Sequence, residues 1–192
     1  MDTIRVAVIG CGYWGKNLVR NFFELGVLHA VCDEKEVVAK EMAKTYNVKA
    51  LSLTEVAESN IDAVVISSPA FKHAEHVKRF LLSGKHVFVE KPLAINVKDA
   101  EELCAIANKV DKKLMVGHLL QYHTAYQKLK QLGSENKLGK LQHIYSNRLS
   151  VGKIRTEENV LWSFAPHDIS MVLGIVGSDP EQVWSTGSYF FN

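Results

Sequence analysis

The sequence predicts an α/β protein in which a doubly wound parallel sheet is followed by a smaller α+β unit. Three observations predict it: short β-branched apolar runs without polar alternation, amphipathic helices between them, and a change of pattern near residue 120. Strands of this kind are buried on both faces, which a parallel sheet covered by helices provides. Because crossover connections are right-handed, the doubly wound topology is favoured. We expect domains at residues 1–120 and 121–192.

Strands and helices are expected to alternate along the first domain. The expected strands are residues 4–9, 27–32, 63–66, 86–89 and 114–116. The first expected helix opens at the glycine-rich loop and ends at Gly26. Further helices are expected at residues 37–46, in a short stretch after Ser52, and at residues 71–82 and 96–108. Ser52 and Glu55 have the spacing of a capping box, and Asn96 is a candidate cap. The spacing of Trp14, Leu18, Val19, Phe22 and Phe23 places them on one side of the first helix.

The second unit has a different pattern. Helices are expected at residues 126–132 and about 167–176, and strands at residues 140–150 and 181–191. So few elements make a thin core, and the pattern stops within the last expected strand. We therefore expect this C-terminal domain to be incomplete in the 192 residues.

Composition excludes several classes of protein. Hydrophobic residues make up 47% and charged residues 23%, as in ordinary soluble globular proteins. The 23 basic and 21 acidic residues leave a net charge of +2, which gives little support to nucleic-acid or membrane-surface binding. No apolar run approaches the ~18 residues of a membrane span, and the start lacks a signal-peptide pattern. Three cysteines without a CxxC pair, Cys11, Cys32 and Cys104, favour reduced thiols and a cytoplasmic location.

A glycine-rich turn follows the first expected strand and opens the first expected helix. It reads G-C-G-Y-W-G, which matches G-x-G-x-x-G in the context that this dinucleotide-binding motif requires. Gly10 permits the tight turn, Gly12 lets a pyrophosphate approach the backbone, and Gly15 lets helix and strand pack closely. The alternative is a glycine-rich turn that binds nothing. The expected cofactor-binding residues of this loop are Gly10, Cys11, Gly12, Tyr13, Trp14 and Gly15.

Polar residues follow the next two strands. Asp33 ends the second expected strand about twenty residues after the loop, where a carboxylate accepts hydrogen bonds from the adenosine ribose and repels a 2′-phosphate. NAD is therefore favoured over NADP, although a plain turn aspartate is the alternative. Ser67 and Ser68 end another strand, where small polar residues suit a ribose and nicotinamide or simply form a turn with Pro69.

The segment 86–92 reads H-V-F-V-E-K-P and carries two opposite charges at the carboxyl end of a strand. Lys91 is suited to hold a substrate hydroxyl and to stabilise negative charge on its oxygen as hydride leaves. Burial would lower the pKa of Lys91, and Glu90 would oppose that shift. A structural ion pair is the alternative. The Lys91–Pro92 bond is also a candidate cis peptide.

The motifs G-C-G-Y-W-G, S-S-P-A-F-K-H and G-K-H-V-F-V-E-K-P-L-A together resemble the Gfo/Idh/MocA family of sugar and cyclitol oxidoreductases. The resemblance covers essentially the whole chain. It implies a Rossmann domain followed by an α/β domain whose open sheet forms an oligomer interface, and hence a homo-oligomer. It also implies that Lys91 is the catalytic lysine, that His73 and Glu90 lie near the nicotinamide half of the cofactor, and that His167 is the acid/base.

The chain departs from many members of that family at two positions. Ser163 stands where many carry an aspartate four residues before the histidine, and Gln121 stands where many carry an arginine that contacts the cofactor. From the sequence alone, His167 follows Pro166 at an expected helix start, where an imidazole is accessible for proton transfer, or is merely packed or at the surface.

The expected substrate is a nucleotide sugar. Lys153 and Arg155 form a small basic loop suited to a phosphate or carboxylate, with a solvated loop as the alternative. The stretch around them resembles the branch of the family that acts at C3 of UDP-linked amino sugars such as UDP-N-acetylglucosamine. The alternatives are an inositol or free-sugar dehydrogenase and a non-catalytic NAD-binding module. His73 and His76 lack partners for a zinc set, so no metal site is expected.

Overall fold

The computed structural model describes residues 4–149 and 159–188, and its centre is a six-stranded sheet in which every pair of neighbouring strands is parallel. The strand order is β3-β2-β1-β4-β5-β6, so the chain runs outward from β1 first to one side and then to the other. This order confirms the doubly wound topology. The strands are β1 (Val6–Ile9), β2 (Leu28–Cys32), β3 (Lys49–Ala50), β4 (Ala63–Ile66), β5 (His86–Val89) and β6 (Leu114–Val116).

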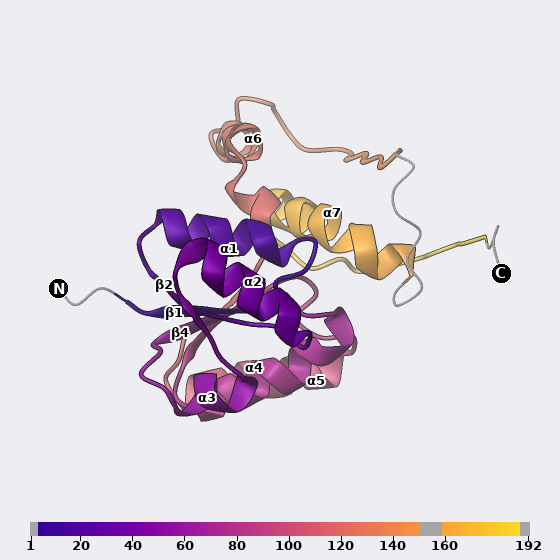
Figure 1. The fold of residues 1–192 in the computed structure, drawn as a ribbon. Coiled ribbons are helices and arrows are strands. Elements are labelled where there is room, and N and C mark those ends of the chain that lie inside the picture. Colours follow the sequence, from indigo (N-terminus) through magenta and orange to yellow (C-terminus); the bar gives the residue numbers. More distant parts are fainter. Residues whose placement is uncertain (1–3, 150–158, 189–192) are drawn as a thin grey trace.

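Helices cover both faces of the sheet (Figure 1). One face carries α1 (Gly15–Glu24) and α2 (Glu36–Tyr46), and the other carries α3 (Leu53–Glu58), α4 (His73–Leu82) and α5 (Val97–Lys109). Val8 of β1 belongs to the core cluster with Val19 of α1, whereas its neighbour Ile9 belongs to the cluster with Phe80 and Leu103. Successive strand side chains thus alternate between two buried cores, which is why the strands show no polar alternation.

Local capping signals begin two helices, α3 and α5, where the sequence places them. The Ser52 hydroxyl accepts a 3.2 Å hydrogen bond from the Glu55 amide, and the Glu55 carboxylate accepts one of 2.8 Å from the Ser52 amide. Asn96 caps α5 by accepting from the Asp99 amide at 2.8 Å. The two-residue strand β3 was not expected, because its exposed residues form no apolar run and only pairing with β2 identifies it.

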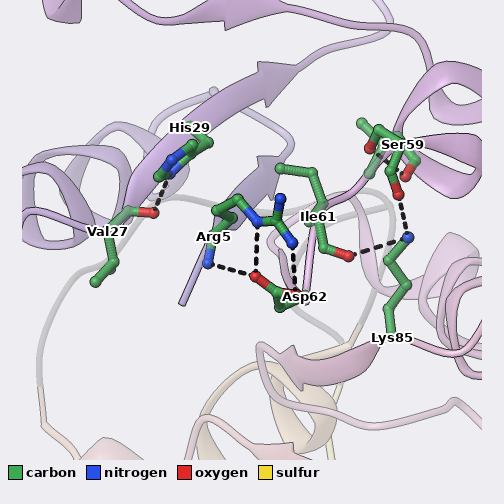
Figure 2. Close-up of polar contacts among 8 residues, drawn as sticks. Arg5, Val27, His29, Ser59, Ile61, Asp62 and Lys85 are labelled. Carbon is green, nitrogen blue, oxygen red and sulfur yellow. Dashed lines mark hydrogen bonds and ion pairs between the residues drawn. The ribbon is translucent and has the colours of Figure 1, made fainter. Parts of the chain in front are cut away.

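Charged side chains tie the amino-terminal edge of the sheet together (Figure 2). The backbone amide, Nε and Nη2 of Arg5 all donate to the Asp62 carboxylate, at 2.8, 3.0 and 3.1 Å. These bonds lower the pKa of Asp62 to about 2. The Lys85 ammonium, on a side chain only 5% exposed, donates to the carbonyl oxygens of Ser59 and Ile61. These residues precede the strands, whereas the candidate functional residues follow the strands at the opposite end of the sheet.

The helices described in the C-terminal unit are hydrogen-bonded to one another. Gln121 Nε2 donates to the Ser170 carbonyl at 2.6 Å, and the Tyr126 hydroxyl donates to the Met171 carbonyl at 3.0 Å. These bonds fasten the long last helix to the two helical segments that precede it. The elements are the 3-10 helix η2 (Leu119–Tyr122) and the α-helices α6 (Thr124–Ser134) and α7 (Val160–Val176).

Both strands expected in this unit are wrong in their described parts. Residues 141–149 and 181–188 form no strand, and their apolar side chains are largely exposed. A strand is stable only when a neighbour satisfies its backbone hydrogen bonds, and no strand within residues 4–149 and 159–188 pairs with either segment. Partial alternation in a sequence cannot supply that neighbour.

The last helix begins seven residues earlier than the expected start near residue 167, because the cap is Asn159 rather than the proline. Asn159 accepts a 3.1 Å hydrogen bond from the Trp162 amide, and Pro166 lies inside the helix. The expectation that His167 stands at a helix start is therefore wrong, since it lies in the interior of α7. No helix in the described part of the chain combines the length and apolar character needed to cross a membrane.

Candidate active site

The glycine loop lies between the carboxyl ends of β1 and β4, where the strand order reverses. Gly10 has a φ of +90°, and a Cβ there would lie 2.8 Å from the Ser67 carbonyl carbon and the Ser68 nitrogen. A Cβ on Gly15 would lie 1.9 Å from the Gly10 oxygen. A Cβ on Gly12 would meet nothing within 4 Å. Two glycines therefore serve packing inside the protein, whereas Gly12 leaves open space beside the backbone where a pyrophosphate fits.

The first turn of α1 presents a helix N-terminus to that open space. Trp14 occupies the N-cap position without a side-chain capping bond, and the first turn contains no acidic residue. The positive end of the helix dipole is therefore not compensated by the helix's own side chains, an arrangement that favours phosphate. Tyr13, also of the loop, is 85% exposed.

Asp33 is joined directly to the glycine loop. Its Oδ2 accepts a 2.7 Å hydrogen bond from the Cys11 amide, and its Oδ1 accepts one of 2.9 Å from the Lys35 amide. The carboxylate thus lies at the end of β2 beside the loop, as ribose recognition requires. Burial, together with the Asp33 charge, raises the pKa of Cys11 to about 12, so this thiol stays protonated.

The two serines after β4 bond to the protein itself. The Ser67 hydroxyl donates to the Gly10 carbonyl at 2.7 Å, and the Ser68 hydroxyl lies 3.1 Å from His76 Nδ1. His73 is 1% exposed, and its ring nitrogens lie 2.7 Å from the Ser68 oxygen and 2.6 Å from the Pro92 oxygen. The buried His73 ring therefore links the turn after β4 to the turn after β5.

The carboxyl end of β5 brings Glu90 and Lys91 beside the glycine loop, and the Lys91–Pro92 bond is cis, as expected. The Trp14 indole Nε1 donates a 2.8 Å hydrogen bond to Glu90 Oε1. Burial raises the pKa of Glu90, although the Trp14 bond and the Lys91 charge act in the opposite direction. The sequence does not predict this pairing, because the helical spacing places Trp14 on the apolar side of the first helix.

Lys91 reaches across to α7. Its Nζ donates a 2.7 Å hydrogen bond to the Ser163 carbonyl oxygen, in the turn just before Pro166. Pro166 has no N–H, so the carbonyl that loses its helical donor is that of Trp162, four positions earlier, and the Ser163 carbonyl bonded by Lys91 follows it in the same turn. The residue four positions before His167 thus contributes its backbone rather than a side chain.

His167 lies four positions after Ser163 in α7, and the Lys91 charge acts on it. Burial, followed by the charges of Lys91, Arg148 and His118, lowers the pKa of His167 to about 4, and Asp168 opposes this shift. The imidazole is therefore neutral at pH 7 and able to accept a proton. Asp168 itself is held by Arg148 and by the Ser146 hydroxyl. Its carboxylate is thus engaged with Ser146 and Arg148.

One expected site residue bonds to the last helix, and two lie outside the described residues. The Gln121 amide donates to the Ser170 carbonyl at the contact between η2 and α7, and its expected contact with the cofactor stays a prediction. Lys153 and Arg155 fall in residues 150–158, outside the described part of the chain. Within that described part, no three His, Cys, Asp or Glu side chains come together in a way that could hold a metal ion.

Comparison with known proteins identifies one family and several relatives. The pattern of the GFO_IDH_MocA oxidoreductases, a family with an NAD-binding Rossmann fold, matches residues 4–118. The chain is 27% identical over 97% of its length to a UDP-N-acetylglucosamine 3-dehydrogenase of Acidithiobacillus ferrooxidans, covering 59% of that protein. It is 28% identical over 96% of its length to a myo-inositol 2-dehydrogenase of Thermotoga maritima, covering 58% of it.

A solved structure resembles the whole described arrangement. The crystal structure of a probable dehydrogenase from Thermotoga maritima superposes with a TM-score of 0.81 at 29% identity, over 92% of this chain and 56% of that one. The chain thus spans less than two thirds of the length of these relatives.

Proposed function

The chain belongs to the Gfo/Idh/MocA oxidoreductase family, and from that premise we propose that it acts as an NAD-dependent dehydrogenase on a nucleotide sugar. The proposed substrate is of the UDP-N-acetylglucosamine type, oxidised at a secondary hydroxyl, with C3 as the reacting carbon. One observation carries the proposal: Lys91, which follows β5 beside the glycine loop, bonds the Ser163 carbonyl of the helix that also bears His167, and its charge lowers the pKa of His167. The relative named as a UDP-N-acetylglucosamine 3-dehydrogenase supports the choice of substrate.

The described residues fit the cofactor of this family. Gly12 leaves space at the backbone, the N-terminus of α1 favours phosphate, and the Asp33 carboxylate is placed for a ribose. Bound NAD supplies the acceptor for the hydride that the oxidised carbon loses. The residues that would hold it are the glycine loop and Asp33, with Ser67, Ser68 and Glu90 lining the strand ends towards Lys91.

Lys91 and His167 divide the chemistry at the substrate oxygen. The His167 imidazole accepts the hydroxyl proton, because pH 7 lies above its lowered pKa and the ring is therefore neutral. The Lys91 ammonium, held in place by the Ser163 carbonyl, donates a hydrogen bond to the same oxygen and stabilises the negative charge that develops there. Proton removal and charge stabilisation therefore act on one atom from two different parts of the chain, the turn after β5 and α7.

The decisive experiment adds NAD and a panel of UDP-sugars and follows the absorbance of the reduced cofactor. Parallel reactions also contain a keto acid, which reoxidises a tightly held cofactor, and there the consumption of the UDP-sugar is measured instead. We expect turnover with a UDP-N-acetylamino sugar. Lys91→Ala should abolish turnover while the Kd for NAD stays within about twofold, since the glycine loop is intact. The matched control, Lys98→Ala, removes an exposed lysine of α5 and should leave both quantities unchanged. Equal loss of turnover and NAD binding in Lys91→Ala would show that the lysine has a structural role rather than a catalytic one.

A second candidate is an inositol dehydrogenase, because the chain is as similar to a myo-inositol 2-dehydrogenase as to the nucleotide-sugar enzyme. UDP distinguishes the two candidates. Saturating UDP should compete with a nucleotide-sugar substrate, whereas oxidation of inositol should be indifferent to it. If no panel member is oxidised although NAD binds, the non-catalytic NAD-binding module becomes the better description.

We also propose that the protein is a cytoplasmic homo-oligomer. Support for association comes from α7, whose Leu161, Ile169 and Leu173 side chains are exposed apolar surface. The three cysteines are free in the structure, which suits a reducing compartment. Light scattering coupled to size exclusion tests the oligomer, and fractionation of the source cells tests the compartment.

A further inference from the structure

His118 occupies a position beside the proposed catalytic lysine that the sequence motifs do not assign. In the parallel pairing of β5 and β6, Val89 lies opposite Val116, and the Gly117 amide donates to the Val89 carbonyl at 2.7 Å. His118 and Lys91 each follow that pair by two residues. The register of the sheet therefore places both residues just beyond the carboxyl ends of two neighbouring strands.

The His118 ring has an unsatisfied polar atom. Its Nδ1 is buried, and among the described residues it has no hydrogen-bond partner; the same is true of Nδ1 of His167. A buried nitrogen without a partner costs free energy, and such atoms in folded proteins usually await a water, an ion or a ligand. Two imidazole nitrogens of this kind in one cluster around Lys91 are therefore a specific feature of this edge.

The charges around His118 keep its ring neutral. Burial, followed by the Lys91 charge, lowers the pKa of His118, and His118 in turn lowers that of His167. A neutral imidazole has one N–H donor and one acceptor nitrogen, so it pairs well with a hydroxyl group, which can act as either. It does not pair with a metal here, because no acidic or thiol group within the described residues completes a ligand set.

We propose that His118 is a substrate-binding residue that hydrogen-bonds a second hydrogen-bonding group of the substrate, on the carbon next to the hydroxyl held by Lys91 and His167. This inference rests on the proposed function and adds to it a residue that recognises the substrate beside the reacting oxygen. A lone alcohol would leave the His118 nitrogen unpaired in the complex and would bind correspondingly weakly. His118 thus selects between substrates, while Lys91 and His167 act on the reacting oxygen.

Three variants and one spectroscopic readout test the proposal. His118→Leu removes the ring nitrogens, His118→Asn places an amide close to the position of Nδ1, and His143→Leu removes an exposed histidine as the control. The probes are UDP-N-acetylglucosamine and myo-inositol, each with NAD present. For the probe that is turned over, we expect KM to rise about tenfold in His118→Leu, to recover partly in His118→Asn and to stay within twofold in His143→Leu.

The rise of KM caused by His118→Leu should be less than about twofold for a monodeoxy analogue that lacks the neighbouring hydroxyl, because His118 would then have nothing to bind. Independently of turnover, imidazole ¹⁵N spectra of the wild-type protein should show the His118 signal moving when a probe is added, with the His143 signal unchanged. This measurement also decides the matter if His118→Leu fails to fold.

The outcomes separate this inference from the proposed function. Turnover with an unchanged KM in His118→Leu overturns the inference and leaves the proposed function standing. Absence of turnover with a moving His118 signal overturns the proposed function and supports the binding role. Absence of both turnover and signal change overturns both.

Discussion

The Trp14 indole donates its hydrogen bond to Glu90 across 76 positions of sequence, at 2.8 Å. The bond joins the start of α1, where the cofactor phosphates are expected, to the end of β5, where Lys91 stands. It also gives a half-buried carboxylate one defined partner. The glycine loop and the proposed catalytic edge are therefore parts of one hydrogen-bonded unit rather than neighbouring features of the same sheet.

Glu90→Gln should stabilise the protein at neutral pH. Because burial raises the pKa of Glu90 in the folded state, its ionised form costs stability, and that cost grows as pH rises from the unfolded-state pKa through the raised folded value. Glutamine removes the charge and still accepts from Trp14. The free energy of unfolding should rise by about 1 kcal/mol at pH 7 and by nothing below pH 4, measured by urea titration. A destabilised variant at pH 7 would show that the carboxylate charge is compensated.

Gly12→Ala and Gly15→Ala should separate cofactor binding from folding. The Gly15 variant places a Cβ 1.9 Å from a backbone oxygen, so it should lower the free energy of unfolding by about 3 kcal/mol or more. The Gly12 variant meets nothing within 4 Å, so its melting temperature should not change. It should nevertheless weaken NAD binding about tenfold or more in calorimetry, since the Cβ occupies the space for the pyrophosphate. Undiminished NAD affinity in Gly12→Ala would show that the backbone at Gly12 does not contact the cofactor.

The His167 ring should titrate near pH 4 in NMR spectra, well below its ordinary value of 6.5. Lys91→Met should raise that midpoint, because the Lys91 charge is the second largest cause of the lowered pKa. Since the folded-state pKa is below the unfolded one, stability should fall as pH drops from about 6.5 towards 4, and His167→Gln should remove this part of the pH dependence. His29→Gln, at an exposed site on β2, is the control.

Asp62→Asn should destabilise the fold without touching the site. The bonds from Arg5 lower the pKa of Asp62 from 3.8 to about 2, so its contribution to stability is present above pH 3.8 and is lost as pH falls through about 2 (Figure 2). We expect a lower melting temperature at pH 7, a shrinking difference between variant and wild type below pH 4, and unchanged NAD affinity. A change in NAD affinity would contradict the separation of the two edges of the sheet.

Local signals made the first domain predictable. Strands β4, β5 and β6 have the expected bounds because each is a short apolar run between glycine or polar turns, and α3 and α5 begin at caps that only their neighbours in sequence determine. The last helix shows the limit of such signals. Pro166 imitates a helix start, although Asn159, seven positions earlier, provides the actual cap.

The sequence by itself determined the doubly wound domain and located the glycine loop and Asp33, because these depend on residue type, short spacing and strand order. The proposed catalytic pair, Lys91 and His167, is a prediction from the resemblance to the family. Only the tertiary structure decided that the Ser163 carbonyl holds Lys91, that Trp14 bonds Glu90, and that His118 stands beside Lys91. Those contacts join residues 72 and 76 positions apart, or depend on the register of two strands. No local pattern encodes such pairings, since they arise only when packing of the sheet and its helices fixes the distances between elements.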